Sequence, residues 1–327
     1  MKKRLLIGII LTAVCFIVII LVRFNLESNK KVSKNHELVS PVPKTLASFF
    51  IPKVNSVLGE SSVWFPDEKK ILGTKQPLPI ITADLAISVD LTTKQVLFEK
   101  NSKIRHPIAS IVKIMTALVA MENAPLDKEI TVSYQAATIG EDSMGIIAGE
   151  RYTLRDLLYG LMLASGNDAA ETIAEGIAGR REIFITLMNA MAVNLGLKDT
   201  KFVNPSGLEE EGQQYSTAYD VIILTQYVLE KFPEFGKIVD TKEYIIPKTS
   251  FHKQIFLTNE TNLLRTYPGV KGVKSGYTPS AGLCLVTLAE NGGQRVLAVV
   301  LGSGDRRGDM VKLLDFSFSS VGVLIKH

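Results

Sequence analysis

One stretch of the sequence, PIASIVKIMTALVA at residues 107–120, constrains the fold more than any other. Apolar residues occupy almost every position after residue 110, so the helix that they predict has no polar face for water. Such a helix belongs at the centre of a fold. Only Ser110, Lys113 and Thr116 interrupt its apolar side chains. A lysine in these surroundings must find a partner, lose its proton or take part in chemistry.

Strand patterns lie on both sides of this helix. Residues 85–90 and 95–100 alternate in polarity and contain β-branched side chains, which predicts a hairpin around a polar turn at 91–94. Towards the C-terminus, two apolar strands joined by ENGG at 290–293 predict a second hairpin. A final helix is expected over 308–321.

The middle of the chain is rich in helical patterns. Leucines at helical spacing follow a Thr153–Asp156 capping pair, and Asp168 with Glu171 predicts a second capped helix start. Further amphipathic helices follow. We therefore expect an α/β (α+β) fold, in which both ends of the chain form an antiparallel sheet flanked by helices, with a mostly helical inserted subdomain between them.

The first residues predict a membrane anchor. Residues 5–22 form an uninterrupted apolar run of about the length that spans a bilayer. Lys2, Lys3 and Arg4 precede it, and the positive-inside rule keeps that end in the cytoplasm. Because no small-residue cleavage site follows, we expect an uncleaved anchor at 1–23, with a cleaved signal peptide as the alternative.

Two further segments complete the predicted organisation. Residues 24–76 are polar, basic and irregular, which predicts an extracytoplasmic linker. The catalytic domain is expected at 77–327. With the anchor in the cytoplasmic membrane, this domain would lie on the outer side, facing the cell wall or periplasm.

The remaining composition argues against several classes of protein. A net charge of +4 is too small to indicate nucleic-acid binding. The sequence contains neither a His-Glu-x-x-His nor a Cys-x-x-Cys motif, so a zinc enzyme has little support. Gly-x-Ser-x-Gly is absent as well. If a serine is the nucleophile, its base is not expected to be histidine.

Three short polar motifs form a candidate active site: SIVK at 110–113, SGN at 165–167 and KSG at 274–276. Each is weak alone, because its residues are common in helix caps, turns and strand edges. Lys113 shares a helix face with Ser110, so a neutral lysine can take the proton of the serine hydroxyl.

The other motifs offer groups for a substrate. Lys274 and Ser275 on a strand edge can hold a carboxylate, and Gly276 leaves room for an extended peptide along that edge. Asn167 can hold a substrate amide, and Ser165 can pass a proton to a leaving amine. At the helix start, the backbone N–H of the nucleophilic serine can face a developing oxyanion.

Together with the sequence around them, these motifs resemble the low-molecular-mass penicillin-binding proteins, specifically the serine D-alanyl-D-alanine carboxypeptidases. The resemblance covers about residues 77–322. It implies a β-lactamase/penicillin-binding-protein-like fold. It also implies that Ser110 attacks the terminal D-Ala-D-Ala bond of a peptidoglycan stem peptide, that D-alanine leaves, and that water frees the serine. No cofactor is implied, and β-lactams would be covalent inhibitors.

Details of the site also follow from the resemblance. It implies that Lys113 is the base and that the backbone N–H groups of Ser110 and Tyr277 form the oxyanion hole. An arginine of the GDRRGD segment would bind the terminal carboxylate, and we favour Arg306 over its neighbour. Ser275 stands where threonine is common in the family.

Three alternatives stay open at this stage. A DD-endopeptidase would cut peptidoglycan cross-links with the same machinery. A class A-like β-lactamase shares the motifs, but it needs a glutamate for deacylation, and no Glu-x-x-Leu-Asn segment lies between SGN and KSG. A wall-binding protein with an inactive site is the third.

Overall fold

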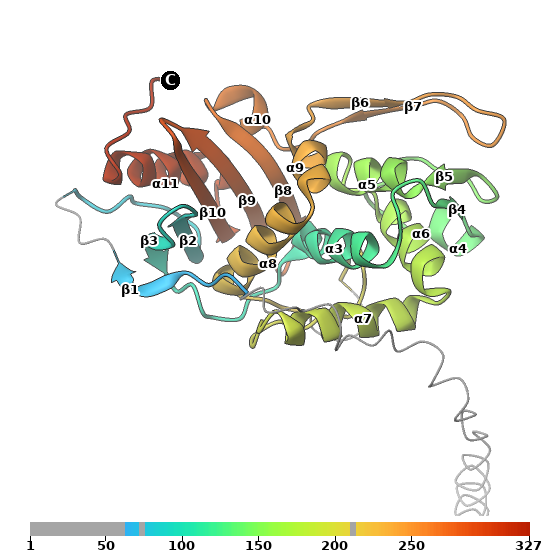
Figure 1. Ribbon diagram of the computed structural model, residues 1–327, viewed down its shortest axis with the longest axis horizontal. Helices are drawn as coiled ribbons and strands as arrows, with labels where there is room; N and C mark the ends of the chain where they lie inside the picture. Colours follow the sequence, from blue (N-terminus) through green and yellow to red (C-terminus); the bar gives the residue numbers. More distant parts are fainter. Residues whose placement is uncertain (1–62, 72–75, 210–213) are drawn as a thin grey trace, which may run out of the picture. The chain divides into compact units, whose positions relative to one another are not determined.

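The computed structural model describes residues 63–71, 76–209 and 214–327 (Figure 1). The expected anchor at 1–23 and most of the expected linker at 24–76 lie outside the described residues. Within the described ranges, no helix is long and apolar enough to cross a membrane.

A six-stranded sheet joins the two ends of the described chain, as the sequence predicts (Figure 1). Its order is β1-β3-β2-β10-β9-β8, and all neighbouring strands are antiparallel except β1 and β3, which are parallel. The expected hairpins are present, and Gly292 and Gly293 between β9 and β10 have φ of +56° and +79°, as a tight hairpin turn requires. The strands are β1 (Asp67–Ile71), β2 (Leu85–Asp90), β3 (Gln95–Lys100), β8 (Val270–Thr278), β9 (Gly282–Asn291) and β10 (Gln294–Ser303).

The outer strand β1 lies where the sequence predicts a linker. It pairs with β3, and the N–H of Asp67 donates to the carbonyl oxygen of Lys94 at 2.8 Å. Trp64, just before it, is buried in the core. The compact unit of the structure begins at Val63, and the catalytic-domain bounds of 77–327 stay a prediction. The charged sequence DEKKI has no alternating pattern that would reveal a strand.

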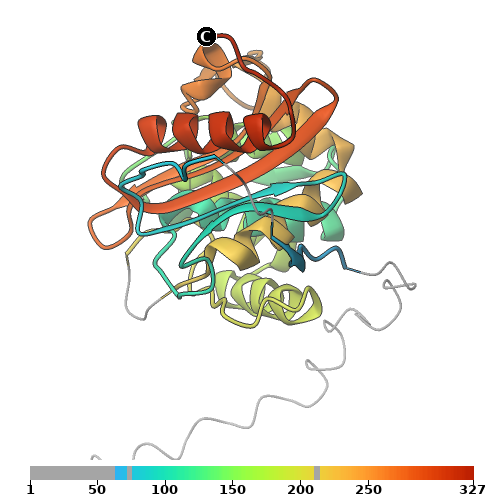
Figure 2. The same ribbon diagram turned by 90° about the vertical axis from the view of Figure 1, so that its left-hand side faces the viewer.

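Alternate side chains of the sheet contribute to two separate hydrophobic clusters. In β10, Leu297 and Val299 face one cluster, whereas Ala298 and Val300 face the other. This is the period of two that a strand buried on both faces requires. The last helix α11 (Arg306–Ser320) packs on the second face (Figure 2).

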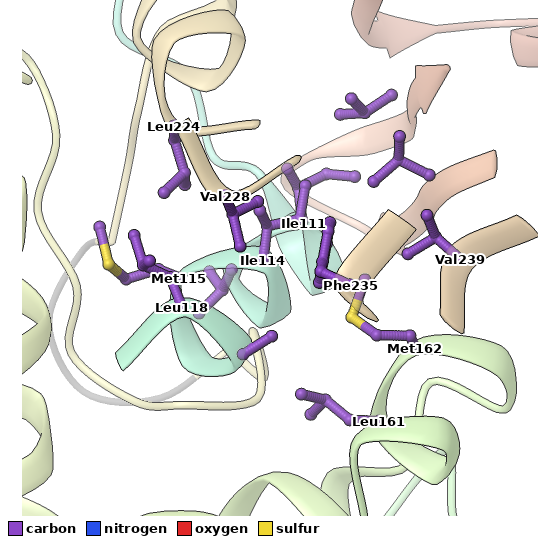
Figure 3. Close-up of a cluster of buried hydrophobic side chains, with 14 of the residues drawn as sticks. Ile111, Ile114, Met115, Leu118, Leu161, Met162, Leu224, Val228, Phe235 and Val239 are labelled. Carbon is purple, nitrogen blue, oxygen red and sulfur yellow. The ribbon is translucent and has the colours of Figure 1, made fainter. Parts of the chain in front are cut away.

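The other face carries the helical half of the molecule, centred on α3 (Lys113–Asn123). Every side chain from Lys113 to Met121 is buried. Figure 3 shows Ile114 and Leu118 of α3 among side chains of the surrounding helices. These helices are α5 (Leu154–Leu163), α6 (Asn167–Ala178), α7 (Arg181–Asn194), α8 (Ala218–Lys231) and α9 (Pro233–Asp240).

Smaller elements complete the helical side. The hairpin β6–β7 projects from it in Figure 1 and carries an exposed cross-strand pair, Ile245 opposite Phe256. No strands were predicted for these residues from the sequence. These elements are α4 (Tyr134–Ala137), α10 (Leu263–Thr266), β4 (Glu129–Thr131), β5 (Arg151–Thr153), β6 (Glu243–Ile246) and β7 (Ile255–Thr258).

Candidate active site

Ser110 lies in a 3-10 turn, η2 (Ala109–Val112), rather than in the α-helix that the sequence predicts for it. The N–H of Ile111 donates to the carbonyl oxygen of Ile108 at 3.1 Å, which closes the tighter turn. Ala109 has φ of +47°, a left-handed conformation that is uncommon for a residue with a side chain. Such local strain occurs where surrounding structure over-determines the backbone, often at functional sites.

The Lys113 ammonium nitrogen, Nζ, has three oxygen partners. It lies 2.8 Å from Ser110 Oγ, 2.8 Å from Asn167 Oδ1 and 2.5 Å from the carbonyl oxygen of Ser206. The side chain is fully buried. Burial, and next the positive charge of Lys274, hold the pKa of Lys113 well below its ordinary value.

The three oxygens around Lys113 Nζ determine where the lone pair of a neutral Lys113 would point. Asn167 Oδ1 and the Ser206 carbonyl can only accept, so each takes one N–H of Lys113. The orientation of the Asn167 amide is fixed because its Nδ2 donates to the carbonyl oxygen of Gly140 at 3.0 Å. A neutral amine has two N–H groups and one lone pair, and the lone pair would then face Ser110 Oγ. This arrangement suits an amine that takes a proton from serine.

The SGN segment completes this cluster at the start of α6. Ser165 Oγ donates to Ser110 Oγ at 3.1 Å, so the Ser110 hydroxyl lies between an amine and a second hydroxyl. Ser165 and Asn167 are both buried. Ser165 has φ of +54°, a second left-handed non-glycine residue beside the nucleophile candidate.

The carboxylate of Asp168 does not cap α6, so that part of the sequence prediction is wrong. Gly166 occupies the N-cap position, and no side chain caps it. Asp168 Oδ2 instead accepts from Ser143 Oγ at 2.5 Å and from the N–H of Gly145 at 2.9 Å, while Oδ1 accepts from the N–H of Met144 at 3.0 Å. One buried carboxylate thus holds the loop whose carbonyl oxygens contact Asn167.

The turn at Asn204–Gly207, which supplies the third partner of Lys113, had no predicted role. Asn204 Oδ1 accepts from the N–H groups of Ser206 and Gly207 at 3.3 and 2.7 Å, and Thr116 Oγ1 donates to the carbonyl oxygen of Pro205 at 2.6 Å. The sequence Asn-Pro-Ser-Gly is a turn signature that could have identified it, although only the fold brings it to α3.

The KSG segment lies on β8, the edge strand of the sheet. Lys274 and Ser275 are buried, whereas Tyr277 is 60% exposed. Among the described residues, the Lys274 ammonium has no hydrogen-bond or ion-pair partner. A Cβ on Gly276 would lie 2.9 Å from the backbone nitrogen of Ser110, so only glycine allows this close approach of β8 to the serine.

Charged groups surround the two buried lysines. The pKa of Lys274 is lowered to about 8, mainly by burial and also by the positive charge of Arg306. The negative charges of Glu260 and Asp142 act in the opposite direction and raise it. Arg306 begins α11, and its Nη1 donates to the carbonyl oxygen of Gly276 at 3.1 Å. Arg307 is exposed. Of the two candidate arginines, the fold therefore brings Arg306 to the β8 edge. No group of three His, Cys, Asp or Glu side chains that could hold a metal ion occurs in the described ranges.

Fold and site together define a serine hydrolase of the low-molecular-mass penicillin-binding class. The family model described as Peptidase_S11, D-alanyl-D-alanine carboxypeptidase, matches residues 72–305. The chain is 41% identical over 248 residues to the D-alanyl-D-alanine carboxypeptidase DacF of Bacillus subtilis. The aligned region covers 72% of this chain and 62% of DacF. This chain belongs to the family of D-alanyl-D-alanine carboxypeptidases.

Solved structures show the same fold. The crystal structure of the Streptomyces K15 DD-transpeptidase aligns with a TM-score of 0.71 and 32% identity, covering 75% of this chain and all of that one. The D-alanyl-D-alanine carboxypeptidase of Mycobacterium tuberculosis aligns with a TM-score of 0.72 and 31% identity, covering 76% of this chain and 96% of that one. The predicted fold class is confirmed.

Proposed function

We propose that this protein is a serine D-alanyl-D-alanine carboxypeptidase, which removes the terminal D-alanine from peptidoglycan stem peptides through an acyl-serine intermediate. One observation carries the proposal. The Ser110 hydroxyl lies within 2.8 Å of a fully buried amine and beside an open strand edge. Membership of the carboxypeptidase family supports it.

Acylation begins when Lys113 takes the proton of Ser110 and the serine oxygen attacks the carbonyl carbon between the two D-alanines. The developing oxyanion accepts hydrogen bonds from the backbone N–H groups of Ser110 and Tyr277. Lys113 then gives up the proton that it took, and Ser165, within 3.1 Å of Ser110 Oγ, relays a proton to the leaving amine, so that Lys113 is neutral again. The C–N bond breaks, D-alanine leaves, and water then hydrolyses the ester to regenerate the serine.

Substrate recognition uses the β8 edge. The peptide lies along the edge as an added strand, with its terminal carboxylate at Lys274 and Ser275. Arg306 adds a second positive charge beside Gly276. Asn167 is held between Lys113 and the carbonyl oxygen of Gly140, and its amide faces the substrate's own amide. A β-lactam presents a carboxylate and a strained amide in the same arrangement, so it acylates Ser110 and is released slowly.

Intact-mass analysis after exposure to penicillin tests this function. We expect the wild-type protein to gain the mass of one penicillin on Ser110, because the serine oxygen forms the ester. Ser110→Ala should gain none, whereas Ser250→Ala, a change at an exposed serine of the β6–β7 hairpin, should label like the wild type. Labelling that persists in Ser110→Ala would move the nucleophile elsewhere. Incubation with uncross-linked and with cross-linked muropeptides, followed by mass analysis of the products, then distinguishes a carboxypeptidase from an endopeptidase.

We also propose that residues 1–23 anchor the protein in the cytoplasmic membrane with the catalytic domain outside. The apolar run at 5–22 and the positive residues before it support this topology. Membrane fractions should retain the full-length protein, and external protease should digest its catalytic domain in spheroplasts. Deletion of 1–23 should release a protein that still binds penicillin. A mature N-terminus beyond residue 22 would show that the segment is a cleaved signal instead.

A further inference from the structure

Arg306 and Lys274 bring two positive groups to one place at the β8 edge. Arg306 Nη1 lies 3.1 Å from the carbonyl oxygen of Gly276, on the same strand as Lys274. The positive charge of Arg306 also lowers the pKa of Lys274, so the two cations lie within range of each other's charge. Like charges repel, and Arg306 is the first residue of α11. The start of α11 therefore needs an attachment that keeps the guanidinium beside β8.

The buried carboxylate of Asp309, one turn further along α11, makes this attachment. Its Oδ2 accepts from Thr82 Oγ1 at 2.7 Å, from the N–H of Ala83 at 2.8 Å and from Ser303 Oγ at 2.6 Å. Its Oδ1 accepts from the N–H of Thr82 at 2.9 Å. Burial opposes the charge of this group, yet the hydrogen bonds from Ser303 and Thr82 hold the pKa of Asp309 below its ordinary value. The carboxylate is therefore ionised at neutral pH, and its hydrogen bonds are charge-assisted.

The partners of Asp309 belong to the central strands of the sheet. Thr82 and Ala83 lie just before β2, and Ser303 is the last residue of β10. These two strands are neighbours in the sheet. Asp309 thus fastens the first turn of α11 to both of them. Arg306 lies three residues earlier on the same turn, so its position depends on this attachment.

The other hydrogen bonds near the start of α11 are exposed. Asp305 caps the helix by accepting from the N–H of Gly308 at 2.9 Å, and Lys312 Nζ donates to the carbonyl oxygen of Ile80 at 3.1 Å. Apolar side chains pack the helix on the sheet only from Met310 onwards. The buried carboxylate is therefore the firmest attachment of the turn that carries the arginine.

We propose that Asp309 is a positioning residue: by fastening the first turn of α11 to β2 and β10, it holds the Arg306 guanidinium where the terminal carboxylate of the substrate binds. The inference rests on the function proposed above and extends its account of carboxylate recognition. Asp309 is 1% exposed, so it acts through Arg306 and does not touch the substrate. A change at Asp309 should weaken recognition of a peptide that ends in a carboxylate and leave the chemistry at Ser110 intact.

Two synthetic peptides test the proposal: Nα,Nε-diacetyl-L-lysyl-D-alanyl-D-alanine, which ends in a carboxylate, and the same peptide ending in a carboxamide. We expect wild-type kcat/KM to be higher for the carboxylate. Asp309→Asn keeps the size of the side chain but replaces one acceptor oxygen by a donor. It should lower kcat/KM for the carboxylate peptide about three- to tenfold, within the range for residues that act together, and leave the carboxamide value unchanged.

Two further variants calibrate this result. Thr82→Val removes one of the donors to Asp309, so it should have a smaller effect in the same direction. Asp315→Asn changes another hydrogen-bonded carboxylate of α11, which accepts from the Tyr267 hydroxyl at 2.9 Å. Because Asp315 lies far along the helix from Arg306, this control should keep the wild-type preference for the carboxylate.

A double-mutant cycle shows whether Asp309 acts through Arg306. In an Arg306→Leu background, Asp309→Asn should cause no further loss on the carboxylate peptide, because the group that it positions is gone. A residue that only stabilises the fold would instead lower the values for both peptides alike, and by the same factor in both backgrounds. That result would overturn the inference.

The possible failures are distinguishable. A wild-type preference in both Asp309→Asn and Thr82→Val overturns the inference, as does a wild-type preference in Arg306→Leu. If these variants still form the Ser110 penicillin adduct, the proposed function stands, and the adduct shows that each is folded. Should Asp309→Asn form no adduct, Thr82→Val decides by the same criteria. A wild-type enzyme that hydrolyses neither peptide and forms no adduct overturns the proposed function, and the inference with it.

Discussion

Two lysines in one site are equally buried and differently partnered. Lys113 on α3 has three oxygen atoms within 2.8 Å of its Nζ. Lys274 on the β8 edge is 1% exposed, yet its ammonium has no partner among the described residues. Burial of the Lys274 side chain disfavours its charge, as its lowered pKa indicates, and we propose that a group arriving from outside pairs with the ammonium.

The difference separates the two tasks of the site. Around Lys113, the α3, α6 and Asn204–Gly207 segments assemble a hydrogen-bond network, to which we assign proton transfer. Along β8, we propose that the positive charge binds a substrate carboxylate and that the unpaired strand edge binds an extended peptide backbone. A catalytic group increases the rate more when the folded protein already holds it in position. A recognition group binds a ligand more tightly when no group of the protein is already paired with it.

The largest effect on acylation is expected from a change at Lys113. Lys113→Arg should reduce penicillin acylation by about 10²–10⁴-fold, because arginine stays protonated and cannot accept the serine proton. Stopped-flow acylation measures the rate. Lys128→Arg, a change at a half-buried lysine shortly after the end of α3, serves as the control. A rate close to wild type in Lys113→Arg would show that the amine does not act as a base.

A smaller effect on acylation is expected from a change at Lys274. Lys274→Met should lower the second-order rate of penicillin acylation by about 10–100-fold, because the hydrogen bond to a ligand carboxylate is lost. The same variant should be more stable than wild type at pH 7, since the buried charge is gone. Urea unfolding and labelling kinetics measure the two effects. Loss of stability would mean that the ammonium has a partner in the folded protein.

The pH dependence should identify Lys274 directly. Its pKa is about 8 in the folded protein and ordinarily 10.5, so the unfolded chain binds more protons between these values. The free energy of unfolding should therefore rise from about pH 8 towards 10.5 in wild type, and rise less in Lys274→Met. Carboxylate binding should weaken over the same range as the ammonium loses its charge. Identical pH profiles for both proteins would contradict the assignment.

Asp168 tests whether the preassembled network depends on its supporting loop. In Asp168→Asn, an amide N–H would face the N–H groups of Gly145 and Ile146, which now donate to the carboxylate. We expect a loss of about 1–3 kcal/mol in the free energy of unfolding and slower acylation. Asp127→Asn, at an exposed carboxylate, should change neither. Normal acylation in a destabilised Asp168→Asn would limit this residue to a structural role.

The smallest effect is expected away from both lysines. Thr153 caps α5: its Oγ1 accepts from the N–H of Asp156 at 3.1 Å. Thr153→Ala should cost about 1 kcal/mol of stability and leave acylation unchanged, whereas Thr153→Ser should restore most of the stability. Thermal unfolding and the acylation rate measure both. Slower acylation in Thr153→Ala would show that the site is more sensitive to remote packing than its hydrogen bonds suggest.

Local patterns in the sequence were sufficient for much of the fold. The β2–β3 hairpin, the buried α3 and the capped α5 were all predicted, because alternation, all-round apolarity and a Thr–Asp pair are local signals. Strand β1 was missed because its charged sequence has no periodicity. The capped start predicted at Asp168 was wrong, because a carboxylate near a helix start can bond to a distant loop as readily as to its own helix.

The sequence by itself determined the three motifs and the spacing that lets Lys113 reach Ser110, since both lie on one short segment. Tertiary structure alone decided which other groups meet them. Ser165, Asn167 and the Ser206 carbonyl come from segments 55 to 96 residues away from Ser110 along the chain, and only packing around α3 brings them to one amine. The choice between Arg306 and Arg307 likewise depended on the direction in which α11 leaves the sheet. Spacing along a chain fixes contacts within one turn of helix, whereas contacts between segments depend on how their apolar faces pack.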